Sequence, residues 1–356
     1  MALTVSHLNT MLRRAKAQLA FRHQTRSSMA LQLHDKRTDT PYRGTLLGPQ
    51  RKVITVTDEL RVRGLTGKIA AITAGWQERE SEDDELQEAI GHRAINLRLH
   101  ARVDEVFARD ADLFAAHRHR QDQLRTLQEL YRLRLDRTYD AARAIYARTG
   151  PAVLLEPERQ AAIEALRELD AHHLRRIHQI HGDFEASVQP TRRGVLVEHR
   201  GQIAEIIAKC RVLAVAGGHV STLLNRMRLL DIPRAMGHLP VIAWSAGAMV
   251  MTERVVLFHD RPPEGPGIAE VLDVGLGVFP DVIALPHATA RLNTADSLRM
   301  SIFAKRFYPA ICLALDPGSR ATWDGNNWTA TPETAMIALD GEFIPLAMTA
   351  QQGGAP

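Results

Sequence analysis

The 356-residue chain has few cysteine and aromatic residues and no long apolar run. Its two cysteines, Cys210 and Cys312, provide no disulfide framework, and Cys312 lies in an apolar run where a small buried side chain is expected. No stretch of eighteen apolar residues occurs, so the sequence predicts no transmembrane helix. Since no secretory signal is recognised, we expect a cytoplasmic protein.

Acidic residues are missing from residues 1–34, although the net charge of the whole chain is only +4. This segment combines arginines and a lysine with apolar residues, which predicts a basic amphipathic helix. Such a helix suits an anionic membrane surface, a transit peptide or packing on folded protein, and these alternatives stay open. No aromatic residues alternate with the basic ones, so we expect no nucleic-acid partner.

The most informative local pattern is an apolar run that ends in a serine. Val241, Ile242 and Ala243 predict a central strand, and Ser245 follows where that strand turns into a helix. The small residues Ala243 and Gly247 flank the serine. A nucleophile elbow requires such neighbours because its strained backbone passes close to adjacent strands. An ordinary serine N-cap is the alternative for this pattern taken alone.

Other predicted strands end in groups that a serine nucleophile needs. Residues 281–287 place His287 at a strand end as a candidate base. Residues 211–218 end in a glycine pair, where Gly218 offers an amide to a developing oxyanion. Asp260 follows a further apolar segment and is a candidate to orient the histidine. Because the carboxyl ends of parallel strands share one edge of a sheet, we expect these groups to meet there.

Together these segments resemble the dipeptidase E and cyanophycinase family of serine peptidases, whose fold is like that of class I glutamine amidotransferases. The glycine pair, the Trp-Ser-Ala-Gly-Ala segment and the Pro-His dipeptide carry the resemblance. It implies a catalytic triad of Ser245, His287 and Asp260, and an oxyanion hole formed by the amides of Gly218 and Ala246. Since serine replaces the cysteine of the amidotransferases, amide transfer from glutamine is not expected.

The resemblance extends over residues 211–343, and the chain departs from the family in the residues expected to bind substrate. His219 stands where the family commonly has asparagine after the glycine pair. Arg291 and Arg299 lie where the family's arginines bind an acidic side chain of the substrate, and a solvated helix face is their alternative role. Asp316 is a reserve candidate to orient the histidine, although Asp-Pro-Gly also favours a plain turn.

The fold that we predict is α/β, a three-layer sandwich with a mostly parallel central sheet and a helical insertion. Its expected parts are a basic N-terminal helical segment (1–40), the first part of the α/β domain (41–100), the helical insertion (101–190) and the second part, which carries the catalytic residues (191–350). Strands of the first part are expected at 44–48, 53–56, 68–73 and 95–99. Apolar residues at helical spacing predict two long helices in the insertion, separated at Gly150-Pro151.

Several histidines fall in the second of these helices, but His173 and His181 lack the spacing that places two imidazoles on one metal ion. We therefore expect a solvated helix face there, and neither a metal nor a cofactor in the protein.

The function that the sequence predicts is that of a serine hydrolase which cleaves small peptides or amide bonds through a covalent acyl-enzyme. The alternative is a non-catalytic ligand-binding protein that signals through its helical insertion. A serine, a histidine and an aspartate together argue against the alternative, since a binding module has no use for all three. We also expect a homodimer. For the insertion, dimerisation, a lid over the active site and docking of a partner stay open, in that order. The substrate and its scissile bond stay open.

Overall fold

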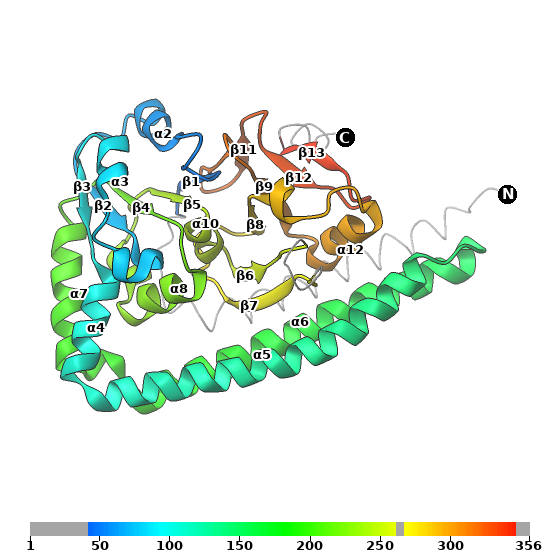
Figure 1. The fold of residues 1–356 in the computed structure, drawn as a ribbon, viewed down its shortest axis with the longest axis horizontal. Helices are drawn as coiled ribbons and strands as arrows, with labels where there is room; N and C mark the ends of the chain where they lie inside the picture. Colours follow the sequence, from blue (N-terminus) through cyan, green and yellow to red (C-terminus); the bar gives the residue numbers. More distant parts are fainter. Residues whose placement is uncertain (1–41, 261–266, 347–356) are drawn as a thin grey trace. The chain divides into compact units, whose positions relative to one another are not determined.

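The computed structural model describes residues 42–260 and 267–346, and the predicted basic helix at residues 1–34 lies outside them. The described chain is a mixed α/β protein with a largely parallel main sheet and many helices (Figure 1). Among the described residues, no helix combines the length and the apolar character needed to cross a membrane.

The main sheet has seven strands in the order β11-β10-β1-β5-β4-β2-β3. Strands β1, β5, β4, β2 and β3 are parallel to their neighbours in this group, and β10 and β11 are antiparallel at one edge. The strands are β1 (Gly44–Leu47), β2 (Ile69–Ile72), β3 (Ala94–Asn96), β4 (Val212–Val215), β5 (Val241–Trp244), β10 (Arg320–Trp323) and β11 (Trp328–Ala330). The central strands are fully buried and, apart from Thr45 in β1, carry no polar side chain, as expected of parallel strands covered on both faces.

Helices cover both faces of this sheet. Alternate strand residues pack with α2 (Val56–Val62) and α3 (Asp84–Ala89) on one face. The other strand residues pack on the opposite face with α4 (Leu99–Arg109), α7 (Gly194–Ile207), α8 (Val220–Leu229) and α10 (Ala246–Met251). A short helix, α9 (Ile232–Ala235), follows α8.

The remaining strands form two further sheets, so the expectation of one central sheet was too simple. A four-stranded sheet has the order β13-β12-β9-β8, with β8 (Val282–Pro286) parallel to β9 (Ile311–Leu315) and with β12 (Ala335–Ile337) and β13 (Phe343–Pro345) antiparallel. A two-stranded sheet pairs β6 (Arg254–Leu257) with β7 (Glu270–Val274). Strand β8, which precedes His287, therefore belongs to a different sheet from β5, which precedes Ser245.

Two of the predicted strands at the start of the domain were wrong in whole or in part. The strand predicted at 53–56 does not exist, because Val53 and Ile54 are exposed by 43% and 53% and α2 begins at Val56. The side-chain oxygen of Gln50 accepts hydrogen bonds from the amides of Thr55 and Val56, at 2.8 Å each. These bonds satisfy amides at the start of the helix. The strand predicted at 95–99 ends at Asn96, and α4 begins at Leu99.

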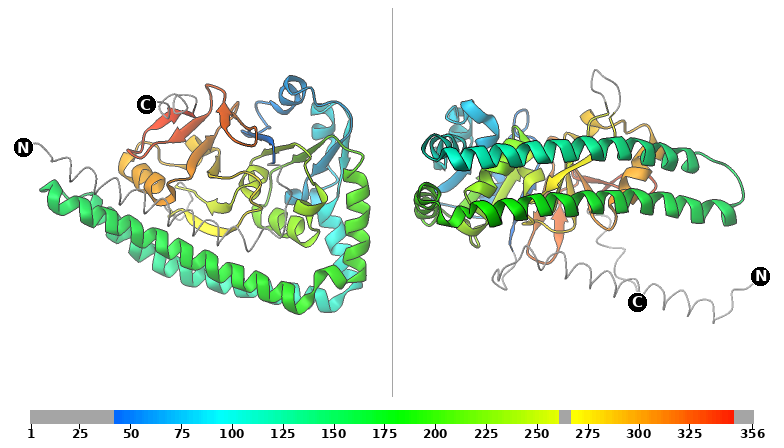
Figure 2. Two further views of the ribbon diagram at one scale, coloured as in Figure 1. Left: turned by 180° about the vertical axis from the view of Figure 1, so that it is seen from behind. Right: turned by 90° about the horizontal axis from the view of Figure 1, so that it is seen from below.

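The two long helices expected from apolar periodicity are present as α5 (Ala111–Tyr146) and α6 (Ala152–Val188). They pack against each other along their lengths as an antiparallel hairpin (Figure 2). Asp110 begins α5 by accepting a hydrogen bond from the Leu113 amide at 2.9 Å. The helix α6 begins at Ala152, earlier than the Pro157 start that was expected, and Pro157 lies within its second turn. The boundaries assigned to the domains stay a prediction.

A buried polar cluster joins the hairpin to α12 (Ser297–Phe307). The guanidinium of Arg306 donates to both carboxylate oxygens of Asp170, at 2.7 Å each, and to the hydroxyl of Tyr131. Tyr131 in turn donates to Asp170 at 2.8 Å. The ring of Tyr131 stacks on His173 at a centroid distance of 4.0 Å. His173 is only 2% exposed and His181 is half-buried, so the expected solvated face was wrong for these two histidines, whereas His172 is exposed as expected.

Candidate active site

Ser245 has the backbone conformation of a strained turn. It follows β5 directly and precedes α10, with φ 51° and ψ −127°. Residues other than glycine seldom adopt a positive φ, and they do so where the surrounding structure forces it. The residue is half-buried at this turn. The strand-to-helix turn that the sequence predicts is therefore present, with its serine in the conformation that a nucleophile elbow uses.

The backbone around this serine is packed so closely that two neighbouring positions require glycine. A Cβ atom at Gly217 would lie 2.6 Å from Ser245 Cβ and 3.4 Å from its Oγ. A Cβ at Gly247 would lie 2.2 Å from the carbonyl oxygen of Val215. The backbone after β4 and the first turn of α10 thus approach each other to distances that only glycine permits.

A third backbone segment, which contains Gly75, packs against the same glycine pair. Gly218 has φ 108°, and a Cβ there would lie 2.3 Å from the carbonyl oxygen of Gly75. The amide of His219 donates to that carbonyl at 2.7 Å. Gly75 lies in a 3₁₀ turn, Ala74–Arg79, in which Gln77 also has a positive φ of 59°. Nothing in the sequence predicted this contact between the two glycine segments.

The amides proposed for the oxyanion hole lie in this packed region. Gly218 follows the glycine that touches Ser245, and Ala246 is the first residue of α10. The first amides of a helix have no acceptor within their own helix. His219 lies beside them, exposed, and its Nδ1 is 2.9 Å from the Thr222 hydroxyl at the start of α8. The roles of these residues in binding an oxyanion or a substrate stay predictions.

His287 lies at the end of β8, beside the end of β9. The two strands are parallel and pair Pro286 with Leu315, and the His287 amide donates to the Leu315 carbonyl at 3.0 Å. This register brings Asp316 next to His287, and the Asp316 carboxylate accepts from the Thr289 amide at 3.2 Å. Burial and the charge of Arg291 lower the pKa of His287, whereas Asp316 acts to raise it. The helix α10 packs on both β5 and β8, the strands that precede Ser245 and His287, and the expected hydrogen bond between these two side chains stays a prediction.

The carboxylate of Asp260, which was expected to orient His287, is hydrogen-bonded to other residues. Its carboxylate accepts from Arg299 Nε at 2.8 Å and from Arg299 Nη2 at 2.5 Å. The Asn293 amide donates to the same carboxylate at 2.9 Å, and the Asp260 amide donates to the Arg291 carbonyl at 2.7 Å. Asp260 therefore holds the turn that follows His287, while the acid whose charge acts on the imidazole is Asp316. The Asp260 carboxylate is thus occupied by Arg299 and Asn293, and the choice between Asp260 and Asp316 as the orienting acid stays a prediction.

The two arginines expected to bind substrate lie in different environments. Arg299 is 9% exposed and bound to Asp260, so its guanidinium charge is already neutralised within the protein. Arg291, at the end of α11 (Ala288–Arg291), is half-buried with its guanidinium 5.8 Å from the centre of the Phe258 ring. Of the two, Arg291 is the better placed to meet a ligand near His287.

The described part of the chain contains no group of three or more histidine, cysteine or acidic residues arranged to hold a metal ion. Both cysteines are buried, and burial raises the pKa of each thiol, so neither is an activated nucleophile.

Comparisons with known proteins give a limited result. No family model and no curated protein matches the sequence. Among solved structures, the chain is similar to a peptidase from an acI-B1 Actinobacterium, with a TM-score of 0.42 and 11% identity over 87% of this chain and 99% of that chain. It is also similar to a protein provisionally named peptidase E from Listeria monocytogenes EGD-e, with a TM-score of 0.40 and 10% identity over 82% of this chain and 98% of that chain.

Proposed function

We propose that this protein is a serine hydrolase that cleaves peptide or amide bonds, with Ser245 as nucleophile and His287 as base. The observation that carries the proposal is the positive φ of Ser245 at the β5–α10 turn, held by glycine contacts that leave no room for a side chain. A serine that only caps a helix has no need of such a backbone, since cap residues usually adopt extended φ and ψ values. The strain is consistent with a turn shaped to present the hydroxyl.

In the proposed reaction, Ser245 Oγ bonds to the carbonyl carbon of the substrate while His287 accepts the hydroxyl proton. The amides of Gly218 and Ala246 donate to the oxyanion. His287 then passes the proton to the leaving nitrogen as the C–N bond breaks, which leaves an acyl ester on Ser245. Water, deprotonated by His287, attacks this ester; the product acid leaves and the proton returns to Ser245.

The electrostatics of His287 support the role of base. Burial and the nearby Arg291 lower its pKa from the ordinary value of 6.5, so the imidazole is neutral at pH 7 and able to accept a proton. In the proposed triad, Asp316 orients the ring from the adjacent strand end. Asp260, the acid that the family resemblance implies, supports the turn behind the ring through Arg299.

Covalent labelling tests the proposal. We expect a small fluorophosphonate to add once, and mass spectrometry to locate the adduct on Ser245. Ser245→Ala should abolish labelling, and His287→Ala should slow it by at least about a hundredfold because the triad acts as a unit. Ser187→Ala, which removes an exposed hydroxyl on α6, is the matched control and should label like the wild type. A folded wild-type protein that stays unlabelled would instead favour the ligand-binding alternative.

A screen of dipeptides, β-aspartyl peptides and simple amides, with Ser245→Ala as the blank, would identify the scissile bond. Light scattering would test the expected homodimer. The cytoplasmic location stays an expectation from the sequence.

A further inference from the structure

The hairpin meets the α/β core at a cluster of titratable side chains beside the end of α8. The cluster contains His181 of α6, Arg228 of α8 and Asp273 of β7, and all three side chains are largely buried. Arg228 Nη1 donates to both carboxylate oxygens of Asp273, at 3.0 Å each. The proposed hydrolase mechanism uses none of these residues.

The Nε2 atom of His181 lies between a hydrogen-bond donor and an acceptor. Arg228 Nη1 is 2.7 Å from this nitrogen, and Asp273 Oδ1 is 3.0 Å from it. Burial acts to raise the pKa of Asp273, but the charge of Arg228 lowers it well below its ordinary value, so the carboxylate is ionised. Arginine only donates and an ionised carboxylate only accepts, so one imidazole nitrogen cannot serve both. Without a proton Nε2 accepts from Arg228, and with a proton it donates to Asp273.

The charges around His181 favour the ring without the proton. Arg120 of α5 is 3% exposed, and its guanidinium meets a neutral acceptor, the side-chain oxygen of Asn225, at 3.5 Å. Arg120 and Arg228 therefore place two cations beside the single carboxylate of Asp273. Burial and these two charges lower the pKa of His181, whereas Asp273 acts to raise it.

Two other titratable groups of α6 face this cluster, His178 and Glu185. Burial and the charge of Arg228 lower the pKa of His178, which Asp273 acts to raise. Glu185 acts on Arg120, but it is exposed, so solvent screens its charge. Neither group supplies the ring with a second buried carboxylate.

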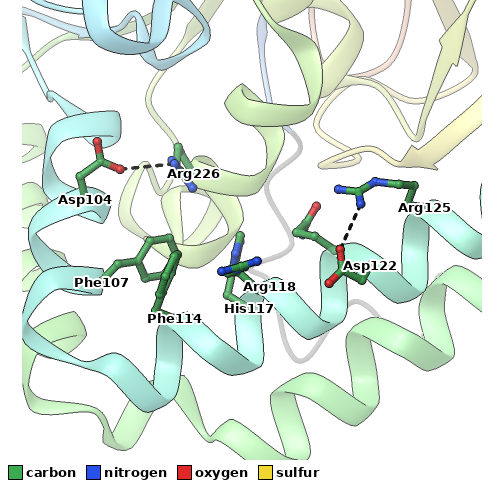
Figure 3. A pocket seen from close by; sticks show the side chains of 9 residues that line it. Asp104, Phe107, Phe114, His117, Arg118, Asp122, Arg125 and Arg226 are labelled. Carbon is green, nitrogen blue, oxygen red and sulfur yellow. Dashed lines mark hydrogen bonds and ion pairs between the residues drawn. The ribbon is translucent and has the colours of Figure 1, made fainter.

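The contact of α5 with α8 has a similar composition. His117 of α5 is 7% exposed and lies near Phe107 and Arg226 (Figure 3). Burial, with the charges of Arg120 and Arg226, lowers the pKa of His117 to about 3. The acid on that side, Asp104, is 3.5 Å from Arg226. Both arginines in the last turn of α8 thus lie close to a histidine that is kept neutral by its surroundings.

We propose that the contact between the hairpin and α8 is a pH-sensitive switch, closed while His181 is neutral and opened when His181 takes up a proton from solvent. In the closed state the ring accepts a hydrogen bond from Arg228. A proton on Nε2 would direct two N–H groups at each other, so the guanidinium withdraws and the hairpin separates from the end of α8. The other end of this helix begins beside Gly218, so the switch adjoins an element of the candidate active site.

Acid pH should therefore open the contact. The docked ring takes up a proton less readily than a ring in solvent, whose pKa is 6.5. The docked state is fully favoured above pH 6.5, and it loses stability as the pH falls from there toward the lowered pKa. Uptake of one proton can raise the opening equilibrium constant by at most about tenfold between about pH 7.5 and about pH 5.5.

Hydrogen–deuterium exchange of the full chain, read by mass spectrometry at these two pH values, tests the switch. After correction for the intrinsic pH dependence of exchange, opening of residues 177–188 should increase by about three- to tenfold at the lower pH. The measurement needs no enzymatic activity, so its outcome is independent of the proposed hydrolase function.

Variants assign the effect to His181. His181→Gln should remove most of the increase, because its amide can accept from Arg228 and donate to Asp273 at every pH. His172→Gln changes an exposed histidine of the same helix and should keep the wild-type increase. Arg228→Gln removes the cation that opposes the proton, so it should flatten or reverse the pH dependence, and it keeps the proposal testable if His181→Gln does not fold.

Three outcomes would overturn the proposal: no acid-dependent increase in the wild type, a full increase in His181→Gln or Arg228→Gln, or loss of the increase in His172→Gln.

Discussion

Around Ser245 the backbones approach so closely that only glycine fits, whereas the hairpin of α5 and α6 is held by long charged side chains buried against the α/β core. Gly217 and Gly247 have backbone or Ser245 atoms within 2.6 Å of where a Cβ would lie. On the hairpin, Asp170 and Arg306 form an ion pair in which both side chains are almost fully buried. The serine turn thus depends on the absence of side chains, whereas the contact of the hairpin with α12 depends on the pairing of Asp170 with Arg306.

The contrast shows how the two regions respond to change. A methyl group added at the serine turn would overlap neighbouring atoms, so it would displace the reacting groups. A lost charge on the hairpin leaves its partner buried and unpaired, so it costs stability while the chemistry of the site is untouched. The predictions below test this division, from the largest expected effect to the smallest.

The orienting acid gives the largest effect on activity. If Asp316 orients His287 as proposed, Asp316→Asn should reduce kcat/KM by about a hundredfold to ten-thousandfold, since the imidazole would lose the carboxylate that selects its tautomer. Asp260→Asn should lower activity less and thermal stability more. The buried guanidinium of Arg299 would then face a neutral amide in place of a carboxylate. The ranking is tested by measuring kcat/KM of both variants with the substrate found in the screen, and by following their thermal unfolding. The opposite ranking would restore Asp260 as the orienting residue.

The buried ion pair gives the largest effect on stability. Asp170→Ala should lower the free energy of unfolding by about 3–5 kcal/mol, because Arg306 is left without a partner in the interior. Glu168→Ala is the control on the same helix: its ion pair with Arg175 is exposed and is worth less than about 1 kcal/mol. Chemical unfolding followed by circular dichroism measures both. Equal values for the two variants would show that the buried pair does not hold the hairpin.

Two glycine variants compare the regions directly. Gly217→Ala should reduce activity by about a hundredfold, since the new methyl group would overlap Ser245 Cβ and shift the hydroxyl. Gly182→Ala in α6 has nothing within 4 Å of the added Cβ, so it should raise stability by about 0.5–1 kcal/mol and leave activity unchanged. A Gly217→Ala enzyme with full activity would show that the serine turn is less constrained than its contacts indicate.

The pH dependence should give the smallest effect. A lowered pKa for His287 means that the neutral base persists below pH 6.5, so kcat/KM should fall only as the pH drops through that lowered value. Arg291→Gln removes a positive charge that lowers the pKa, so the acid limb of the profile should move to higher pH. A limb that stays in place or moves to lower pH in this variant would mean that another group controls it.

Local pattern was enough to predict several elements. The apolar run before Ser245 is β5, and the run before His287 is β8. These segments succeed because strand and helix periodicity, turn residues and burial all favour the same element. The run at 53–56 failed because Val53 and Ile54 are exposed, and the side chain of Gln50 accepts hydrogen bonds from the Thr55 and Val56 amides at the start of α2.

What the sequence by itself determined is the set of groups at the ends of strands: the serine turn, the histidine, the glycine pair and the two candidate acids. Only the tertiary structure showed that Asp260 binds Arg299, 39 residues away along the chain, and that the backbone of His287 pairs with the residue before Asp316. The pairing of β8 with β9 brings Asp316 to His287, and packing of α12 brings Arg299 to Asp260. The physical reason is that strand register and helix packing follow from burial over the whole molecule, whereas a short segment specifies only its own conformation.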